Sequence, residues 1–144
     1  MMNSILVVCE GNLCRSPMAA AMLGSLLKGQ QVASAGLNAL VGMPAAQYAC
    51  DVMRERGHDI TGHRATQIAR SLCSSADVIL AMDGAQKRQI ESQFSFTRGR
   101  VFRLGEFLDI DVEDPYRRPK SEFERCAELI SVCLTEWTTR FSAL

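Results

Sequence analysis

Four short apolar runs, separated by segments with helical spacing, constrain the fold of this chain more than any other feature. The runs lie at residues 4–9, 31–36, 77–82 and 100–104. Helical segments are expected at residues 17–28, 44–56, 66–73 and 84–93, and from a capping box, Ser121 to Glu124, onward. Strands that alternate with helices form a parallel sheet with right-handed crossovers and helices on both faces. We therefore expect one α/β domain over residues 1–144, with a four-stranded parallel sheet.

The composition is that of an ordinary globular protein and excludes several classes of partner. Of the 144 residues, 47% are hydrophobic and 22% charged, and 16 basic residues balance 16 acidic ones. No net charge attracts the chain to nucleic acid or to an anionic membrane surface. Its apolar runs are far shorter than the roughly 20 residues that span a bilayer. The N-terminus lacks a signal-peptide pattern, so we expect a cytoplasmic protein. We also expect it to act as a monomer.

The six cysteines are expected to be free thiols. Without a secretion signal, and with a chain long enough for a real core, disulfides are not needed. None of the cysteines has the spacing of a zinc site, so we expect no metal and no cofactor. Cys50, Cys126 and Cys133 fall in apolar helical patterns and are expected to pack in the core.

The segment VVCEGNLCRSP, residues 7–17, marks the first turn from strand to helix. Ser16 suits a helix N-cap and Pro17 the first helical position. Gly11 and Asn12 tolerate unusual backbone angles, so the loop can curl until its amides converge. Amides at a helix start bind oxyanions, phosphate above all, and an arginine fork can hold two phosphate oxygens. The predicted phosphate-binding residues are Glu10, Gly11, Asn12, Leu13, Cys14, Arg15 and Ser16.

Cys9 stands at the mouth of this loop, where the amides and Arg15 favour its thiolate form. A lone cysteine at the end of a strand is usually a packing residue. Here the anion cradle and the arginine lie beside it, so we expect Cys9 to be an in-line nucleophile on a bound phosphate. A phenolate leaving group needs a proton, and Asp114 in the segment EDPYRRP is the best candidate for a general acid. On its local sequence alone, Asp114-Pro115 would be read as a turn.

Cys9, Arg15 and Ser16 near the N-terminus, together with the distant Asp114-Pro115-Tyr116, resemble the low-molecular-weight protein tyrosine phosphatases. The resemblance covers nearly the whole chain. It implies that Cys9 forms a cysteinyl-phosphate, that Arg15 and the loop amides stabilise the phosphoryl oxygens, and that Asp114 protonates the departing tyrosine.

The same resemblance implies roles for residues that would otherwise be ordinary. Asn12, Ser16, Ser34 and His63 match positions that hold the loop in shape. Tyr116 and Leu40 match the walls that flank the substrate ring. Cys14 matches a second loop cysteine that can form a disulfide with the nucleophile and protect it from over-oxidation.

The expected physiological substrate also rests on the family resemblance. The segments GLNALVG and DPYR resemble bacterial members that act on autophosphorylating tyrosine kinases controlling exopolysaccharide production. Glu10 departs from the family pattern, because relatives mostly carry an apolar residue or threonine there. A carboxylate that points to solvent should weaken phosphate binding only modestly, and it could disfavour acidic residues near the phosphotyrosine.

Three alternatives remain open at this point. An arsenate reductase of the same fold would need resolving cysteines, of which Cys73 is in a plausible region. A protein-arginine phosphatase would carry threonine in place of Leu13. A non-catalytic phosphate-binding module would need neither Cys9 nor Asp114.

Overall fold

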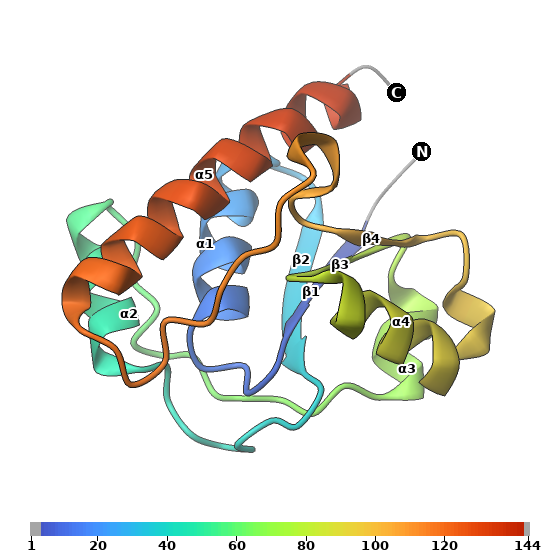
Figure 1. Ribbon diagram of the computed structural model, residues 1–144, viewed down its shortest axis with the longest axis horizontal. Helices are drawn as coiled ribbons and strands as arrows, with labels where there is room; N and C mark the ends of the chain where they lie inside the picture. The colour runs from blue at the N-terminus through green and yellow to red at the C-terminus, as the bar shows by residue number, and fades with distance from the viewer. Residues whose placement is uncertain (1–3, 143–144) are drawn as a thin grey trace.

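The computed structural model describes residues 4–142 as one parallel sheet between two layers of helices (Figure 1). All strand pairs are parallel, in the order β2-β1-β3-β4. The strands are β1 (Ser4–Cys9), β2 (Gln31–Gly36), β3 (Val78–Ala81) and β4 (Val101–Arg103). The predicted fold class is therefore confirmed. Residues 1–3 and 143–144 of the predicted domain lie outside the described residues.

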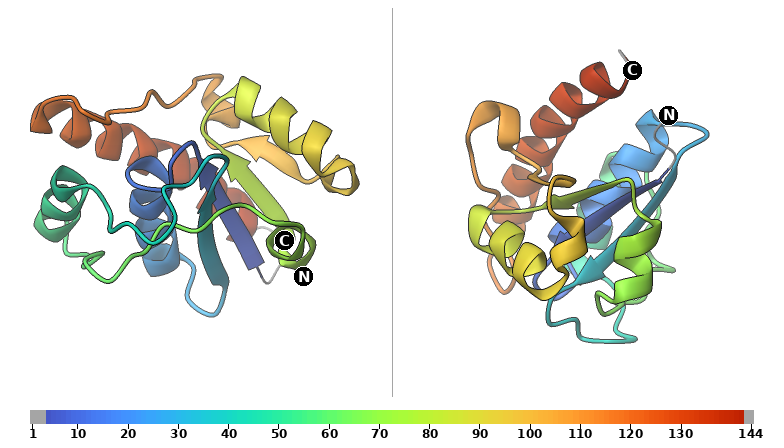
Figure 2. Two further views of the ribbon diagram at one scale, coloured as in Figure 1. Left: turned by 90° about the horizontal axis from the view of Figure 1, so that it is seen from below. Right: turned by 90° about the vertical axis from the view of Figure 1, so that its right-hand side faces the viewer.

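Helices cover both faces of the sheet (Figure 2). The face with the longest helix carries α1 (Arg15–Leu26), α2 (Gln47–Glu55) and α5 (Lys120–Ser142). The opposite face carries α3 (Arg70–Ser75) and α4 (Gly84–Gln93). Two short 3₁₀ turns, Ser95–Thr97 and Glu106–Leu108, flank β4.

β1 lies in the middle of the protein and contributes to the core on both of its faces. Because side chains alternate along a strand, Ile5, Val7 and Cys9 enter the cluster under α1, α2 and α5. Leu6 and Val8 enter the cluster under α3 and α4. Both faces are buried, so this strand reads as a continuous apolar run rather than as an alternating pattern.

Two predicted helix starts are wrong by one or two residues. α1 begins at Arg15 with Cys14 as its N-cap, so Ser16 lies inside the helix and caps nothing. The reason is that the Ser16 hydroxyl is hydrogen-bonded to Cys9 and Asn12 instead. α5 begins at Lys120, which places Ser121 within the helix rather than at its cap.

Two other helices are shorter than predicted. α2 begins at Gln47, and residues 44–46 precede it without regular secondary structure. Residues 66–69 are extended, because this segment pairs with the end of β2. The Gly36 N–H donates to the Thr66 carbonyl at 2.8 Å, and the Ile68 N–H donates to the Gly36 carbonyl at 2.9 Å. Long-range pairing thus replaces the local helix that the sequence favours.

The carboxyl ends of the strands form the edge at which chemistry is expected. From β1 the chain crosses to β2 on one side, and it later returns to β3 on the other side of β1. Such a switch in direction leaves a crevice outside the strand ends. The loop that contains Cys9 begins there. The Val112 N–H donates to the Met82 carbonyl, at 2.9 Å, and thereby brings the segment that precedes Asp114 to the same edge.

Among residues 4–142, no helix combines the length and the apolar character that crossing a membrane requires.

Trp137, the chain's single tryptophan, ties α5 to the segment between β4 and Asp114. Its indole Nε1–H donates to the Leu104 carbonyl oxygen at 2.7 Å, and its side chain is buried. The ring also packs against Phe102 and Phe107, with centroid distances of 5.5 and 4.6 Å. One residue therefore joins the last strand, the loop after it and the last helix.

Replacing Trp137 with Phe should lower the free energy of unfolding by about 1–3 kcal/mol, because the buried Leu104 carbonyl loses its donor. Urea denaturation followed by circular dichroism measures this change without relying on the lost fluorophore. Val132→Ala, an exposed site on the same helix, should change the free energy by less than about 0.5 kcal/mol. Equal stability of Trp137→Phe and the parent protein would contradict this role.

Candidate active site

The loop between β1 and α1 is held from outside through its carbonyl groups. All six carbonyl oxygens from Cys9 to Cys14 accept a hydrogen bond. Their donors are, in order, the backbone N–H groups of Leu37, Asn38 and Leu40, the ring of His63, and the backbone N–H groups of Ala46 and Met18. Because a carbonyl can only accept, His63 carries its proton on Nε2, which lies 2.7 Å from the Asn12 oxygen.

The orientation of the loop amides follows from this arrangement. In a trans peptide unit, the carbonyl of one residue and the N–H of the next point in opposite directions. With the carbonyls of residues 9–14 directed outward to the surrounding segments, the N–H groups of residues 10–15 point toward the inside of the loop. Converging amides at a helix start are a site for an oxyanion.

Asn12 fixes the sharpest part of this loop. Its φ is 61°, a left-handed conformation that asparagine tolerates better than most residues. Its fully buried side chain donates from Nδ2 to Ser16 Oγ at 2.7 Å and to Ser34 Oγ at 3.0 Å. The Oδ1 atom accepts from the Thr66 N–H at 2.8 Å. These bonds satisfy the buried amide and connect the loop to β2 and to the extended segment beyond it.

Cys9 ends β1 with its sulfur 2.9 Å from Ser16 Oγ. The Asn12 amide already donates to this hydroxyl oxygen, so the Ser16 proton is available to the sulfur. The sulfur is thereby oriented by a buried hydrogen bond at the carboxyl end of β1. The geometry therefore supplies a nucleophile at the edge of the anion site.

Two other thiols lie near the site but are held in the protonated form. Burial raises the pKa of Cys14 far above its ordinary value, and the nearby Asp114 carboxylate adds to the increase. Burial likewise raises the pKa of Cys126 to about 12. Both groups are thiols at neutral pH, so neither competes with Cys9 as a nucleophile.

Arg15 presents its guanidinium to the site from the first position of α1. The side chain is buried, and its Nη1 donates to the Val112 carbonyl at 2.9 Å. Its Nε is a buried donor that has no acceptor among residues 4–142. Leaving such a donor unpaired costs about 1–3 kcal/mol, and a bound oxyanion would recover this cost. Nε and Nη2 form the planar edge that binds two oxygens at once.

Asp114 lies next to this arginine, with its Oδ2 atom 3.5 Å from Nη2. Its other oxygen accepts from the Tyr116 N–H at 3.1 Å, which orients the carboxylate at the mouth of the site. A cleft of about 180 Å³ leads to Cys9. Leu40 and Tyr116 line it, and both side chains are partly exposed. The structure thus brings the predicted nucleophile, acid and walls together.

Glu10 points away from the anion site. It is exposed, and its Oε2 atom accepts from Asn38 Nδ2 at 2.6 Å. Asn38 therefore holds this residue twice, because its backbone N–H also donates to the Glu10 carbonyl at 2.9 Å.

The residues that sequence reasoning missed act mainly through their backbones. Thr66, Val112 and Asn38 contact Asn12, Arg15 and Glu10 as described above. Gly36 is a further case, because a Cβ atom there would lie 2.8 Å from the Glu10 carbonyl oxygen and 3.0 Å from the Asn12 nitrogen. Its place at the end of a predicted strand, in ASAG, was the only available signal. At Thr66 and Val112 the contact is made by the backbone alone, so the residue type carries no signal of it.

Comparisons with known proteins identify the family of this chain. The model of the family "Low molecular weight phosphotyrosine protein phosphatase" matches residues 4–143. The probable low molecular weight protein-tyrosine-phosphatase EpsP of Ralstonia nicotianae is 50% identical over 144 residues, which cover 100% of this chain and 99% of that protein.

Two solved structures show the same fold. The structure of Vibrio vulnificus Wzb in complex with benzylphosphonate has a TM-score of 0.94 at 34% identity, and covers 97% of this chain and 99% of that one. The YwlE arginine phosphatase from Geobacillus stearothermophilus has a TM-score of 0.92 at 31% identity, and covers 98% of this chain and 94% of that one.

Gly36→Ala should disrupt the anion site while the protein stays folded, because the added methyl group meets the loop backbone. Misplacing binding groups by about 1 Å can cost about 10²-fold, so we expect phosphate affinity to fall by about this factor. Calorimetric titration with inorganic phosphate measures it. Gly24→Ala in α1, where no atom lies within 4 Å of the new Cβ, is the matched control. Unchanged phosphate affinity in Gly36→Ala would show that the loop can relax.

Proposed function

The chain belongs to the low molecular weight phosphotyrosine protein phosphatase family, and we propose that it hydrolyses phosphotyrosine in proteins through a cysteinyl-phosphate on Cys9. The observation that carries this proposal is the position of the Cys9 sulfur. It lies at the edge of a ring of inward-pointing amides, within hydrogen-bonding distance of Ser16.

In the first step, the Cys9 thiolate attacks phosphorus and the bond from phosphorus to the tyrosine oxygen breaks. The loop amides and Arg15 bind the three non-bridging oxygens and stabilise the charge that develops on them. A phosphate dianion replaces Asp114 as the partner of Arg15 Nη2. Released from the arginine and facing a dianion, the Asp114 carboxylate takes up a proton from solvent and then donates it to the departing tyrosine oxygen as the bond breaks.

In the second step, the Asp114 carboxylate accepts a proton from water as the water attacks the phosphorus of the cysteinyl-phosphate. The phosphorus–sulfur bond breaks, which releases inorganic phosphate and restores the Cys9 thiolate. Ser16 stabilises this leaving thiolate by the same hydrogen bond that favours it at the start. One carboxyl group therefore acts first as acid and then as base.

Phosphotyrosine is the preferred substrate because the cleft suits an aromatic ring. Leu40 and Tyr116 stand on two separate loops and supply apolar walls. Relatives of the same fold include arginine phosphatases, so phosphoarginine is the alternative to assay. An arsenate reductase would need a resolving thiol, and Cys73 does not suit this role. It is fully buried in the cluster under α3 and α4, whereas Cys9 lies in the cluster on the other face.

The cellular role follows the resemblance to bacterial phosphatases of autophosphorylating tyrosine kinases. We assign this protein to the control of exopolysaccharide production, as a cytoplasmic monomer whose partner is such a kinase. Cys14 serves as a reversible guard: it forms a disulfide with oxidised Cys9 and is restored by reduction.

Cys9→Ser should abolish hydrolysis of an aryl phosphate but retain binding of phosphate, since the amides and Arg15 remain in place. Phosphate release and calorimetric titration measure the two properties separately. Cys50→Ala, which removes a thiol from α2 well outside the loop, should keep both. Normal turnover by Cys9→Ser would overturn the covalent mechanism.

Asp114→Ala should slow hydrolysis by about 10²–10⁴, the usual share of general acid catalysis. The loss should be larger for phenyl phosphate than for p-nitrophenyl phosphate, because nitrophenolate leaves more readily without a proton. Steady-state kcat for both substrates tests this difference. Asp59→Asn, a carboxylate in a remote turn, should show neither loss. Equal losses on the two substrates would assign Asp114 a structural role instead.

A further inference from the structure

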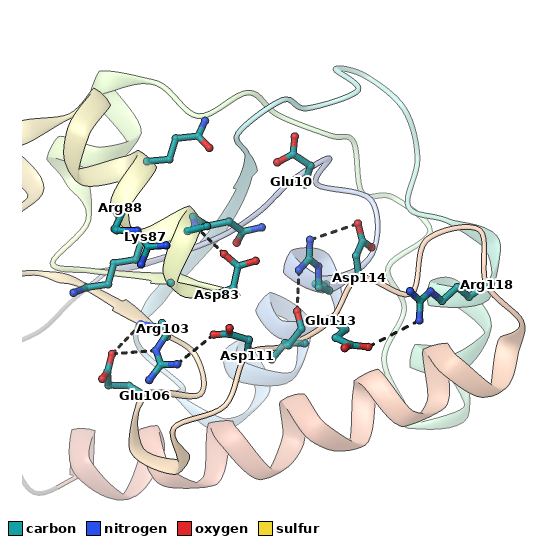
Figure 3. Close-up of a pocket in the computed structure, with 16 residues that line it drawn as sticks. Glu10, Asp83, Lys87, Arg88, Arg103, Glu106, Asp111, Glu113, Asp114 and Arg118 are labelled. Atoms are coloured by element: carbon teal, nitrogen blue, oxygen red, sulfur yellow. Dashed lines mark hydrogen bonds and ion pairs between the residues drawn. The ribbon is translucent and has the colours of Figure 1, made fainter.

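A wide groove of about 1290 Å³ adjoins the catalytic cleft and is not used by the mechanism above (Figure 3). Its walls come from α4, from the end of β4 and from the segment that carries Asp114. Two residues, Glu10 and Asp114, line both the groove and the cleft that leads to Cys9. A polypeptide whose phosphotyrosine occupies the cleft can therefore continue directly into the groove.

Most charges along the groove are already neutralised by neighbours. The basic side chains in ion pairs are Arg15, Lys87, Arg103 and Arg118. The carboxylates that line the groove within residues 106–114 all pair with members of this set. Asp83 accepts from the Gln86 N–H at 2.8 Å and caps α4. These groups are therefore all engaged by neighbours, in ion pairs or, for Asp83, in a helix cap.

Apart from the capping carboxylate of Asp83, two charged residues in the groove have no ionic partner among residues 4–142: Glu10 and Arg88. Both side chains are exposed. Glu10 stands on the loop after β1, where the neutral amide of Asn38 fixes one oxygen and leaves the other available. Arg88 stands on α4, on another side of the groove (Figure 3).

We propose that this groove binds the residues that flank the phosphotyrosine, with Glu10 selecting a basic side chain and Arg88 an acidic one. The proposal rests on the proposed function and names the substrate class that this site prefers. The selected substrate is a phosphotyrosine segment with lysine or arginine on the part near Glu10 and aspartate or glutamate on the part near Arg88. Flanking residues of an extended segment enter the groove at the edge that Glu10 and Asp114 share with the cleft.

A set of phosphotyrosine peptides in an alanine background tests this selectivity. Each peptide carries a single Lys or a single Glu at one of the flanking positions, and kcat/KM is measured by phosphate release at low ionic strength. At the positions that face Glu10, Lys should be favoured over Glu by about twofold to fivefold, the range for exposed ion pairs. At those that face Arg88, the order should reverse. Both preferences should shrink at high salt.

Charge-neutral variants assign each preference to its residue. Glu10→Gln keeps an acceptor for Asn38 and should abolish only the preference for Lys, whereas Arg88→Gln should abolish only the preference for Glu. The ratio of the two peptides is taken within each variant, so a change in absolute rate cancels. Glu128→Gln on α5 makes the same change in net charge as Glu10→Gln, but outside the groove, and should alter neither preference.

The two proposals fail in different ways. A flat profile, or a profile that survives both Glu10→Gln and Arg88→Gln, overturns the selectivity while leaving the phosphatase intact. Binding of the same peptides to Cys9→Ser, measured by fluorescence anisotropy, tests the selectivity independently of hydrolysis. Selective binding without hydrolysis by the parent protein would contradict the proposed function alone. Peptides bound without regard to charge would contradict the selectivity, whatever the rate of hydrolysis.

Discussion

The buried side-chain amide of Asn12 is the interaction on which the rest of the site depends. It holds a left-handed residue in the middle of the loop and orients Ser16 toward the Cys9 sulfur. An unpaired amide in the interior would be costly, and all three of its hydrogen bonds are made. They go to Ser16, to Ser34 on β2 and to Thr66, and so hold these segments together with the loop. The direction of the catalytic amides is thus fixed by parts of the chain that never contact a substrate.

The acid is positioned by a second set of contacts, independent of the first. Val112 is held from two sides, since its N–H donates to Met82 and its carbonyl accepts from Arg15. Arg103 forms ion pairs with Asp109 and Asp111, on the segment that leads to Val112. Asp114 follows two residues after Val112, at the mouth of the cleft. The nucleophile therefore belongs to a rigid core element, while the acid belongs to a long surface segment that several side chains tie to the strand ends.

Local signals predicted the elements well and their boundaries less well. The four strands and the helix Gly84–Gln93 with its Asp83 cap agree with the structure because propensity, burial and capping all favour them there. Ser16 does not cap α1, because its hydroxyl is hydrogen-bonded to Cys9 and Asn12 instead, and Ser121 lies inside α5, which begins one residue earlier. Residues 66–69 became extended through pairing with Gly36, a contact between distant parts of the chain. Long-range competition of this kind cannot be read from a local pattern.

The sequence by itself determined the chemistry of the site: a thiol at a strand end, a glycine and an asparagine that allow the curl, an arginine, and a distant Asp-Pro. These are properties of residue type and spacing, so they can be read from the sequence alone. Only the tertiary structure decided which atoms meet. It paired the carbonyls of residues 9–14 with donors from four other places in the chain, and so turned the amides inward. It also left Glu10 and Arg88 in one groove without an ionic partner among residues 4–142, because the pairing of a surface charge depends on neighbours that only folding supplies.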